Sequence, residues 1–305
     1  MINTHINKLL VLGMSAILLS CVHNQSHSKE SKKAFTSYWD GFDFSDKNYV
    51  DNPGITEPKF VAFCKYLTSM DRYESRRQID TLLHRSLEGN IDMFENIMEL
   101  ADRYLADPNS PYRNEETYIK FLEYTISEPH LTDAYKERPR FQLSIANKNR
   151  VGTKAADIKY VTREGTTGKL SAIDSRYTLI YFNNPDCHDC KRVTDYIKHS
   201  TTISRMQKCQ SLTILAVYAD KDLSSWETHK KEYPKNWIVS RYASEENMDS
   251  YNLPAIPNLY LLDQSKRVLL KDAPIESIEE YLSNHIKKAN YETDKDYSRP
   301  LSCHP

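Results

Sequence analysis

The sequence predicts an all-helical N-terminal domain followed by a three-layer α/β domain, a central sheet flanked by helices. Between residues 36 and 149 the apolar residues recur every three or four positions, as on helices buried along one face. From 150 to 290, short runs rich in β-branched and aromatic residues alternate with amphipathic segments. The 305 residues, of which 39% are hydrophobic, suffice to give each domain its own core.

The composition excludes several classes of function. The formal net charge is -1, and no block of Lys and Arg alternates with aromatic residues, so nothing predicts a nucleic-acid partner. The chain holds 7 glycines and contains neither a GxGxxG turn nor a GxxxxGK[ST] loop. Nucleotide binding through either loop is therefore excluded.

The first 21 residues have the features of an export signal. Lys8 precedes an apolar run from Leu9 to Leu19, which is too short to span a membrane but suits a signal peptide. The letters Leu-Leu-Ser-Cys ending at Cys21 resemble a bacterial lipobox, which implies that Cys21 carries a lipid anchor. An ordinary signal peptide with a chance cysteine is the alternative. The polar residues 22–35 then predict a flexible tether.

Four helices are predicted in the N-terminal domain, where they form a bundle. Their apolar faces lie in the segments 57–70, 74–90, 91–107 and 114–128. Gly89 and Asn90 are a usual C-terminal helix signal, and a proline follows each of the last two segments. Cys64 lies on the apolar face of the first segment, so we interpret it as a packed core residue.

Six strands and three helices are predicted in the second domain. The strands are the segments 157–162, 176–183, 212–220, 236–243, 258–263 and 267–273, and the helices are 191–206, 223–233 and 275–290. The last segment, 291–305, is a polar tail.

The motif Cys187-His188-Asp189-Cys190 lies between a predicted buried strand and an amphipathic helix. Residues three apart share one face of a helix, close enough for a small adjustment to join the two sulfurs in a disulfide. The positive end of the helix favours a thiolate on the first cysteine. We therefore interpret Cys187 as the nucleophile and Cys190 as the resolving thiol.

Three segments in this order resemble the TlpA-like, membrane-tethered branch of the thioredoxin fold. They are the opening segment VGTKAADIKY (151–160), with Ala156 where proline is usual, the strand and motif TLIYFNNPDCHDC (178–190), and the turn and strand YNLPAIPNLYLLD (251–263). The helical region resembles the module of unknown function that precedes such domains in Gram-negative lipoproteins.

The resemblance implies a thioredoxin-like thiol:disulfide oxidoreductase facing the periplasm from the cell envelope. In this family the bond before the matching proline is cis, so Pro257 and Ile256 would line the substrate groove; Pro254 is the competing candidate. No organic cofactor or metal is implied, because the dithiol itself carries the electrons. The expected partners are disulfide-containing exported proteins and a membrane or periplasmic reductant.

The residues around the two cysteines predict how the redox couple is tuned. Asp186 stands where tryptophan is usual in the family, and Asp189 lies between the cysteines. Both carboxylates disfavour a thiolate and so favour a reducing couple, whereas protonated His188 acts in the opposite direction.

Other interpretations of the cysteines stay open. A redox-inactive thioredoxin-like binding module, acting through the helical domain, is the main alternative. Cys187 and Cys190 could instead form half of a metal site, for which Cys303 and His304 offer further ligands, or a permanent disulfide staple. For Cys209 we favour a buried thiol, with a Cys209–Cys303 bridge as the alternative.

Overall fold

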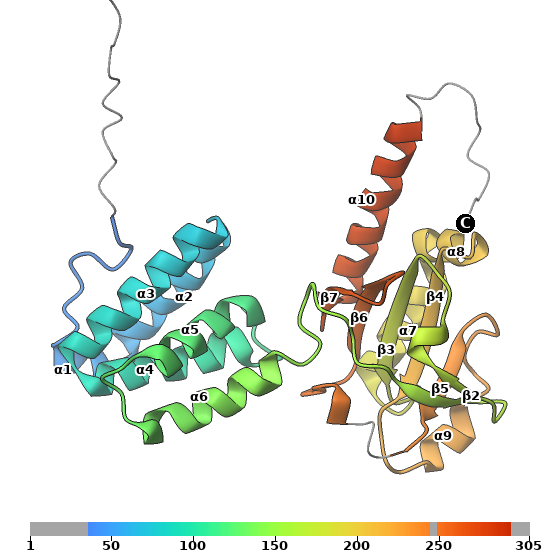
Figure 1. Cartoon of the computed structure of the whole chain (residues 1–305), viewed down its shortest axis with the longest axis horizontal. Coiled ribbons are helices and arrows are strands. Elements are labelled where there is room, and N and C mark those ends of the chain that lie inside the picture. The colour runs from blue at the N-terminus through green and yellow to red at the C-terminus, as the bar shows by residue number, and fades with distance from the viewer. Residues whose placement is uncertain (1–35, 245–248, 294–305) are drawn as a thin grey trace, which may run out of the picture. The chain divides into compact units, whose positions relative to one another are not determined.

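The computed structural model describes residues 36–244 and 249–293 (Figure 1). The predicted signal peptide, Cys21 and the tether lie outside the described residues, as do Cys303 and His304. Within the part that is described, no helix combines the length and the apolar character needed to cross a membrane.

The N-terminal domain is helical, as the periodicity predicts. The four predicted segments form α2 (Pro53–Thr68), α3 (Arg72–Gly89), α4 (Ile91–Ala101), which the π-helix η1 (Asp102–Ala106) continues, and α5 (Glu115–Ser127). The side chains of Asp71, Asn90 and Asn114 accept backbone N–H groups in the first turns of α3, α4 and α5, where these donors lack a helical partner. The fully buried core includes Phe60, Phe63, Ile79, Leu82, Ile97 and Phe121.

Two further helices of this domain were not predicted. One is the short α1 (Lys47–Asp51), and the other is α6 (Asp133–Ala146), which contains Pro139. Proline lacks an amide N–H and usually ends a helix, but here Pro139 is buried as α6 packs against α5. Phe141 of the same helix is 67% exposed.

The second domain contains a seven-stranded sheet with the order β2-β1-β5-β4-β3-β6-β7. The strands are β1 (Lys159–Thr162), β2 (Thr167–Lys169), β3 (Tyr177–Asn183), β4 (Leu212–Tyr218), β5 (Ile238–Tyr242), β6 (Asn258–Asp263) and β7 (Val268–Lys271). β4 runs parallel to both β3 and β5, and the remaining pairs are antiparallel. All six predicted strands are present. The added β2 has three residues, too few to produce a periodic signal.

The helices of this domain follow the predicted order, with one division. They are α7 (His188–His199), α8 (Thr201–Lys208), α9 (Ser224–His229) and α10 (Ile275–Thr293), and the 3-10 helix η2 (Leu170–Ala172) precedes β3. The single helix predicted over 191–206 is divided at Ser200, whose extended backbone ends α7. Its hydroxyl accepts the Ile203 amide N–H at 3.0 Å and so caps α8.

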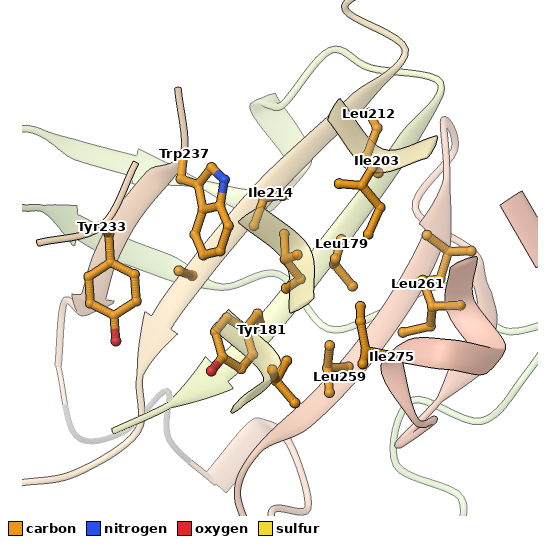
Figure 2. Close-up of a cluster of buried hydrophobic side chains, with 14 of the residues drawn as sticks. Leu179, Tyr181, Ile203, Leu212, Ile214, Tyr233, Trp237, Leu259, Leu261 and Ile275 are labelled. Atoms are coloured by element: carbon orange, nitrogen blue, oxygen red, sulfur yellow. The ribbon is translucent and has the colours of Figure 1, made fainter. Parts of the chain in front are cut away.

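The two faces of the sheet carry separate cores. Alternate residues of β3 point to opposite faces: Leu179 and Tyr181 to one, Ile180 and Phe182 to the other. The first face packs against α7, α8, α9 and α10. Figure 2 shows part of this core, with Ile203 of α8 and Ile275 of α10 next to the strands. In the described part of the chain the second face is covered by η2 and by extended segments, through Leu170, Ile158 and Tyr251. The layer on this face is therefore built mainly by η2 and extended segments in place of long helices.

Candidate functional site: a dithiol at a helix N-terminus

The turn after β3 places Cys187 at the start of α7. The side-chain oxygen of Asn184 accepts a hydrogen bond from the backbone N–H of Asp186 at 2.9 Å. The backbone carbonyl oxygen of Asn184 accepts one from the backbone N–H of Cys187 at 3.1 Å. Cys187 is the N-cap of α7, and its sulfur accepts the Cys190 amide N–H at 3.3 Å. A short side chain with an acceptor atom is what an N-cap requires, so the first cysteine both begins the helix and faces its positive end.

The two sulfurs differ in their access to solvent. Cys187 is half-buried, whereas Cys190 is 1% exposed. Burial, followed by the hydrogen bond with Cys187, raises the pKa of the Cys190 thiol to about 12. Both are free thiols in this structure. The arrangement therefore offers one accessible sulfur for attack and keeps the second protonated beneath it.

The loop before β6 lies against the first cysteine. Antiparallel pairing sets Phe182 of β3 opposite Asn258 of β6, so the end of β3 and the start of β6 meet at one edge of the sheet. The Ile256–Pro257 bond is cis, and the Cys187 thiol donates to the Ile256 carbonyl oxygen across 3.7 Å. This agrees with the bond that the resemblance implies. The structure thus brings Cys187 together with Ile256 and Pro257, which the sequence separates by about 70 residues.

The charged residues expected to tune the couple are exposed to solvent. The side chain of His188 is 96% exposed and lies 3.8 Å from the Asp189 carboxylate. The Asp186 carboxylate lies 3.8 Å from Nε2 of His229, whose Nδ1 is 2.9 Å from Glu232. Because water screens exposed charges, these groups act weakly on the sulfurs. His229 comes from α9, and no sequence pattern links it to the dithiol.

Buried polar residues lie behind Cys190. The Tyr181 hydroxyl donates to the Cys190 carbonyl oxygen at 2.6 Å and lies 3.0 Å from the Thr194 hydroxyl. The Tyr233 hydroxyl donates to the Asn183 side-chain oxygen at 2.6 Å. Burial raises the pKa of both tyrosines, so both remain neutral hydrogen-bond donors. Their inward positions follow the alternation of β3, but the specific contacts could not be predicted.

The other cysteines lie apart from this pair. Cys64 is 4% exposed in the helical core, where burial raises its pKa to about 12, so its interpretation as a packed residue is confirmed. The favoured interpretation of Cys209 is wrong: this residue is half-buried and disulfide-bonded, with its partner outside the described residues. Over residues 36–244 and 249–293, no three His, Cys, Asp or Glu side chains are grouped to hold a metal ion.

Comparisons with known proteins cover both domains. Residues 26–149 match a domain of unknown function (DUF5106), and residues 174–268 match the family described as thioredoxin-like. A crystal structure of a thioredoxin-like protein from Bacteroides caccae ATCC 43185 is 40% identical, with a TM-score of 0.77 over 81% of this chain and 90% of that chain. No curated protein matches the chain.

Two further solved structures match one domain only. The C-terminal domain of an uncharacterized protein from Bacteroides fragilis NCTC 9343 is 38% identical, with a TM-score of 0.43 over 45% of this chain and 99% of that chain. A thiol:disulfide interchange protein from Bacteroides sp. is 19% identical, with a TM-score of 0.39 over 44% of this chain and 88% of that chain.

Proposed function

Because the chain belongs to the thioredoxin-like proteins, we propose that it is a lipid-anchored thiol:disulfide oxidoreductase that reduces disulfides of exported proteins. The observation that carries this proposal is the asymmetry of the dithiol. Cys187 is accessible at a helix N-cap, and Cys190 is buried one turn further along. Attack and resolution require these two different environments.

The proposed reaction has two exchange steps. The Cys187 thiolate attacks one sulfur of a substrate disulfide, forms a mixed disulfide and releases the other substrate sulfur as a thiolate. Cys190 then loses its proton and attacks the Cys187 sulfur, which forms the Cys187–Cys190 disulfide and releases the second substrate thiolate. Two electrons pass to the substrate, and a membrane or periplasmic dithiol reductant restores the pair. The residues Ile256 and Pro257 border the attacking sulfur.

The environment of the sulfurs supports a reducing couple. A strong oxidant needs a reduced form that is stabilised as a thiolate. Here burial raises the pKa of Cys190, and the Cys187 thiol donates to a carbonyl oxygen, which is an interaction the thiolate cannot make. These two contacts oppose the helix N-terminus, whose Cys190 amide N–H donates to the Cys187 sulfur, and we expect them to favour the reducing direction.

The reduction potential tests this function. The full chain in detergent is equilibrated in glutathione or dithiothreitol buffers, and its free thiols are counted by mass spectrometry. Besides the reduction of the Cys209 disulfide, we expect a two-electron transition near that of thioredoxin, about -270 mV, that is absent from the Cys187→Ser, Cys190→Ser variant. A midpoint near about -120 mV would contradict the reducing direction. The absence of a transition that depends on Cys187 and Cys190 would instead support the redox-inactive binding module.

The proposed anchor has a separate test. Export and a lipid on Cys21 would keep the chain at the periplasmic side of the envelope, where disulfides occur. Cells given a labelled fatty acid should label the wild-type chain but not Cys21→Ala. A Cys21→Ala chain that still takes up the label would contradict the lipoprotein assignment and leave the redox proposal intact.

A further inference from the structure

A cavity of about 180 Å³ is lined by residues of the helical domain and of the loop before Pro257. Its apolar lining comes from Ala106 of η1, Phe141 and Ile145 of α6, and Pro254 of the loop. Pro254 precedes the cis bond by two residues, so one wall of the cavity belongs to the same loop that contacts Cys187. A polypeptide whose disulfide reaches Cys187 therefore meets the loop that also forms this wall.

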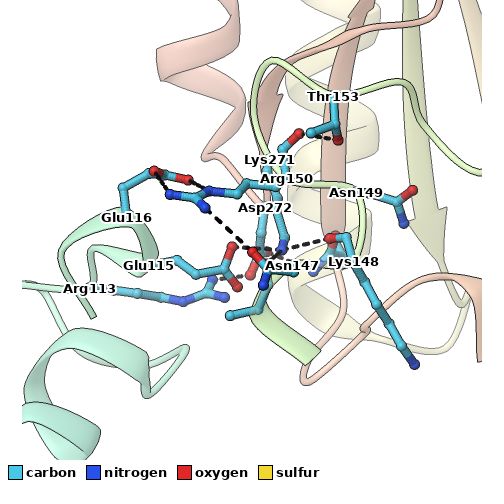
Figure 3. A network of polar contacts seen from close by, with 12 residues as sticks. Arg113, Glu115, Glu116, Asn147, Lys148, Asn149, Arg150, Thr153, Lys271 and Asp272 are labelled. Atoms are coloured by element: carbon cyan, nitrogen blue, oxygen red, sulfur yellow. Dashed lines mark hydrogen bonds and ion pairs between the residues drawn. The ribbon is translucent and has the colours of Figure 1, made fainter. Parts of the chain in front are cut away.

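The charged groups of the cavity wall have their partners within the protein. Asp102 accepts hydrogen bonds from Tyr118, Arg138 and Gln142 at 2.7–3.0 Å. Figure 3 shows two ion pairs of the same wall, one between Glu115 and Lys271 at 2.6 Å and one between Arg113 and Asp272. Because these charges are already paired, a ligand gains little by bringing a charge of its own. Apart from these residues and Asn252, the lining of the cavity is apolar.

The size and exposure of the apolar surface match one side chain. A cavity of about 150 Å³ lined by apolar residues holds one benzene molecule, so about 180 Å³ accommodates an aromatic or branched aliphatic group. Phe141 is 67% exposed and gains apolar contact when such a group enters.

One of these ion pairs is also hydrogen-bonded to the start of β6, directly after the cis bond. The Asp272 carboxylate that pairs with Arg113 also accepts the side-chain N–H of Asn258 at 2.7 Å. Asn258 directly follows Pro257 and is fully buried. The hydrogen bonds therefore run without interruption from the helical domain to the residue beside the cis bond.

We propose that this cavity receives an apolar side chain of the substrate polypeptide, close in sequence to the cysteine that Cys187 attacks. The helical domain then selects substrates, and the thioredoxin-like domain carries out the exchange. This inference rests on the proposed function and names the substrate class: unfolded or extended polypeptides with an aromatic or aliphatic residue beside a disulfide.

The test compares two peptides and one small disulfide. The peptides carry one cysteine in mixed disulfide with glutathione and differ only in a Phe or Ser three residues away; the small disulfide is oxidised glutathione. With the full chain in detergent, Phe141→Ala should raise the KM for the Phe peptide about tenfold, as expected from the loss of a buried aromatic contact. Its reaction with the Ser peptide and with oxidised glutathione should not change.

Tyr73→Ala is the matched control, because Tyr73 is 73% exposed on α3 of the same domain and does not line the cavity. We expect wild-type kinetics from it. If the wild-type protein reduces both peptides with equal KM, or if both alanine variants behave alike, the cavity does not select substrates although the redox function stands. If no disulfide is reduced, including oxidised glutathione, the proposed function itself fails and this inference fails with it.

Discussion

The hydroxyl of Tyr181 donates a 2.6 Å hydrogen bond to the backbone carbonyl oxygen of Cys190. This contact joins the central strand β3 directly to the first turn of α7, because Tyr181 points to the face that the helix covers. The same hydroxyl opposes part of the effect of burial, which is the main cause of the raised pKa of the Cys190 thiol. Tyr181 is therefore a positioning residue for the resolving sulfur.

Tyr181→Phe should slow the second exchange step severalfold. Without the hydroxyl the pKa of the Cys190 thiol rises further and its thiolate forms less readily. The mixed disulfide on Cys187 should therefore persist longer. Acid quenching followed by intact-mass measurement gives this lifetime. Tyr233→Phe is the matched control, since it removes a second buried hydroxyl that binds Asn183 and makes no hydrogen bond to Cys190. Equal lifetimes in the two variants would refute the positioning role.

Alkylation should distinguish the two sulfurs of the reduced protein. At pH 8, iodoacetamide should modify Cys187 but not Cys190, because Cys190 is 1% exposed and its thiol, with a pKa of about 12, stays protonated. Cys64 should also resist until the chain is unfolded, for the same reasons. Peptide mapping after a short reaction checks this order. Faster modification of Cys190 than of Cys187 would reverse the assignment of nucleophile and resolving thiol.

The buried Cys64 should make stability fall at alkaline pH. Its pKa is about 12 in the folded protein and near 9.0 in an unfolded chain, so below pH 9 both states bind the proton and stability does not depend on it. Above pH 9 the unfolded chain loses this proton first, which lowers the free energy of unfolding by about 1.4 kcal/mol per pH unit. Urea unfolding at pH 8 and pH 10.5 should show a smaller loss for Cys64→Ala than for the wild type. Equal losses would show that this thiol does not contribute.

The ion pair between Arg113 and Asp272 should be strongly coupled. Both side chains are largely buried, at 19% and 15% exposed. Arg113→Leu alone should cost about 3 kcal/mol of unfolding free energy, because it leaves a buried carboxylate without its cation. The double variant with Asp272→Asn should lose less than the sum of the single losses, as measured by urea unfolding. Additive losses would mean that the two groups do not stabilise each other.

The dithiol and its flanking elements could be predicted because their signals are local. The spacing of Cys187 and Cys190, the apolar run before them and the amphipathic segment after them all lie within about 25 residues. The cis bond at Ile256–Pro257 was implied by the resemblance alone, since no local pattern distinguishes a cis proline from a trans one.

The remaining features depend on contacts between distant segments. The side chain of His229, on α9, lies near Asp186 in the turn before α7. The residues around Cys209 contain no pattern that predicts its disulfide bond. The helix that contains Pro139 forms because its packing outweighs a local helix-breaking signal. The division of the predicted helix 191–206 depends on a single backbone conformation at Ser200, where a hydroxyl replaces the continuing helical hydrogen bonds.

The two borders of the sheet bear on how the folded chain resists aggregation. The outermost strands are β2, with three residues, and β7, with four, and the pairing of β7 with β6 is interrupted by an irregularity at Leu261 and Leu262. Short or irregular outer strands expose only a short row of unpaired backbone N–H and C=O groups. A strand of a second chain can therefore form few hydrogen bonds with them. In a crowded compartment this arrangement resists the strand-by-strand growth from which fibrous aggregates form.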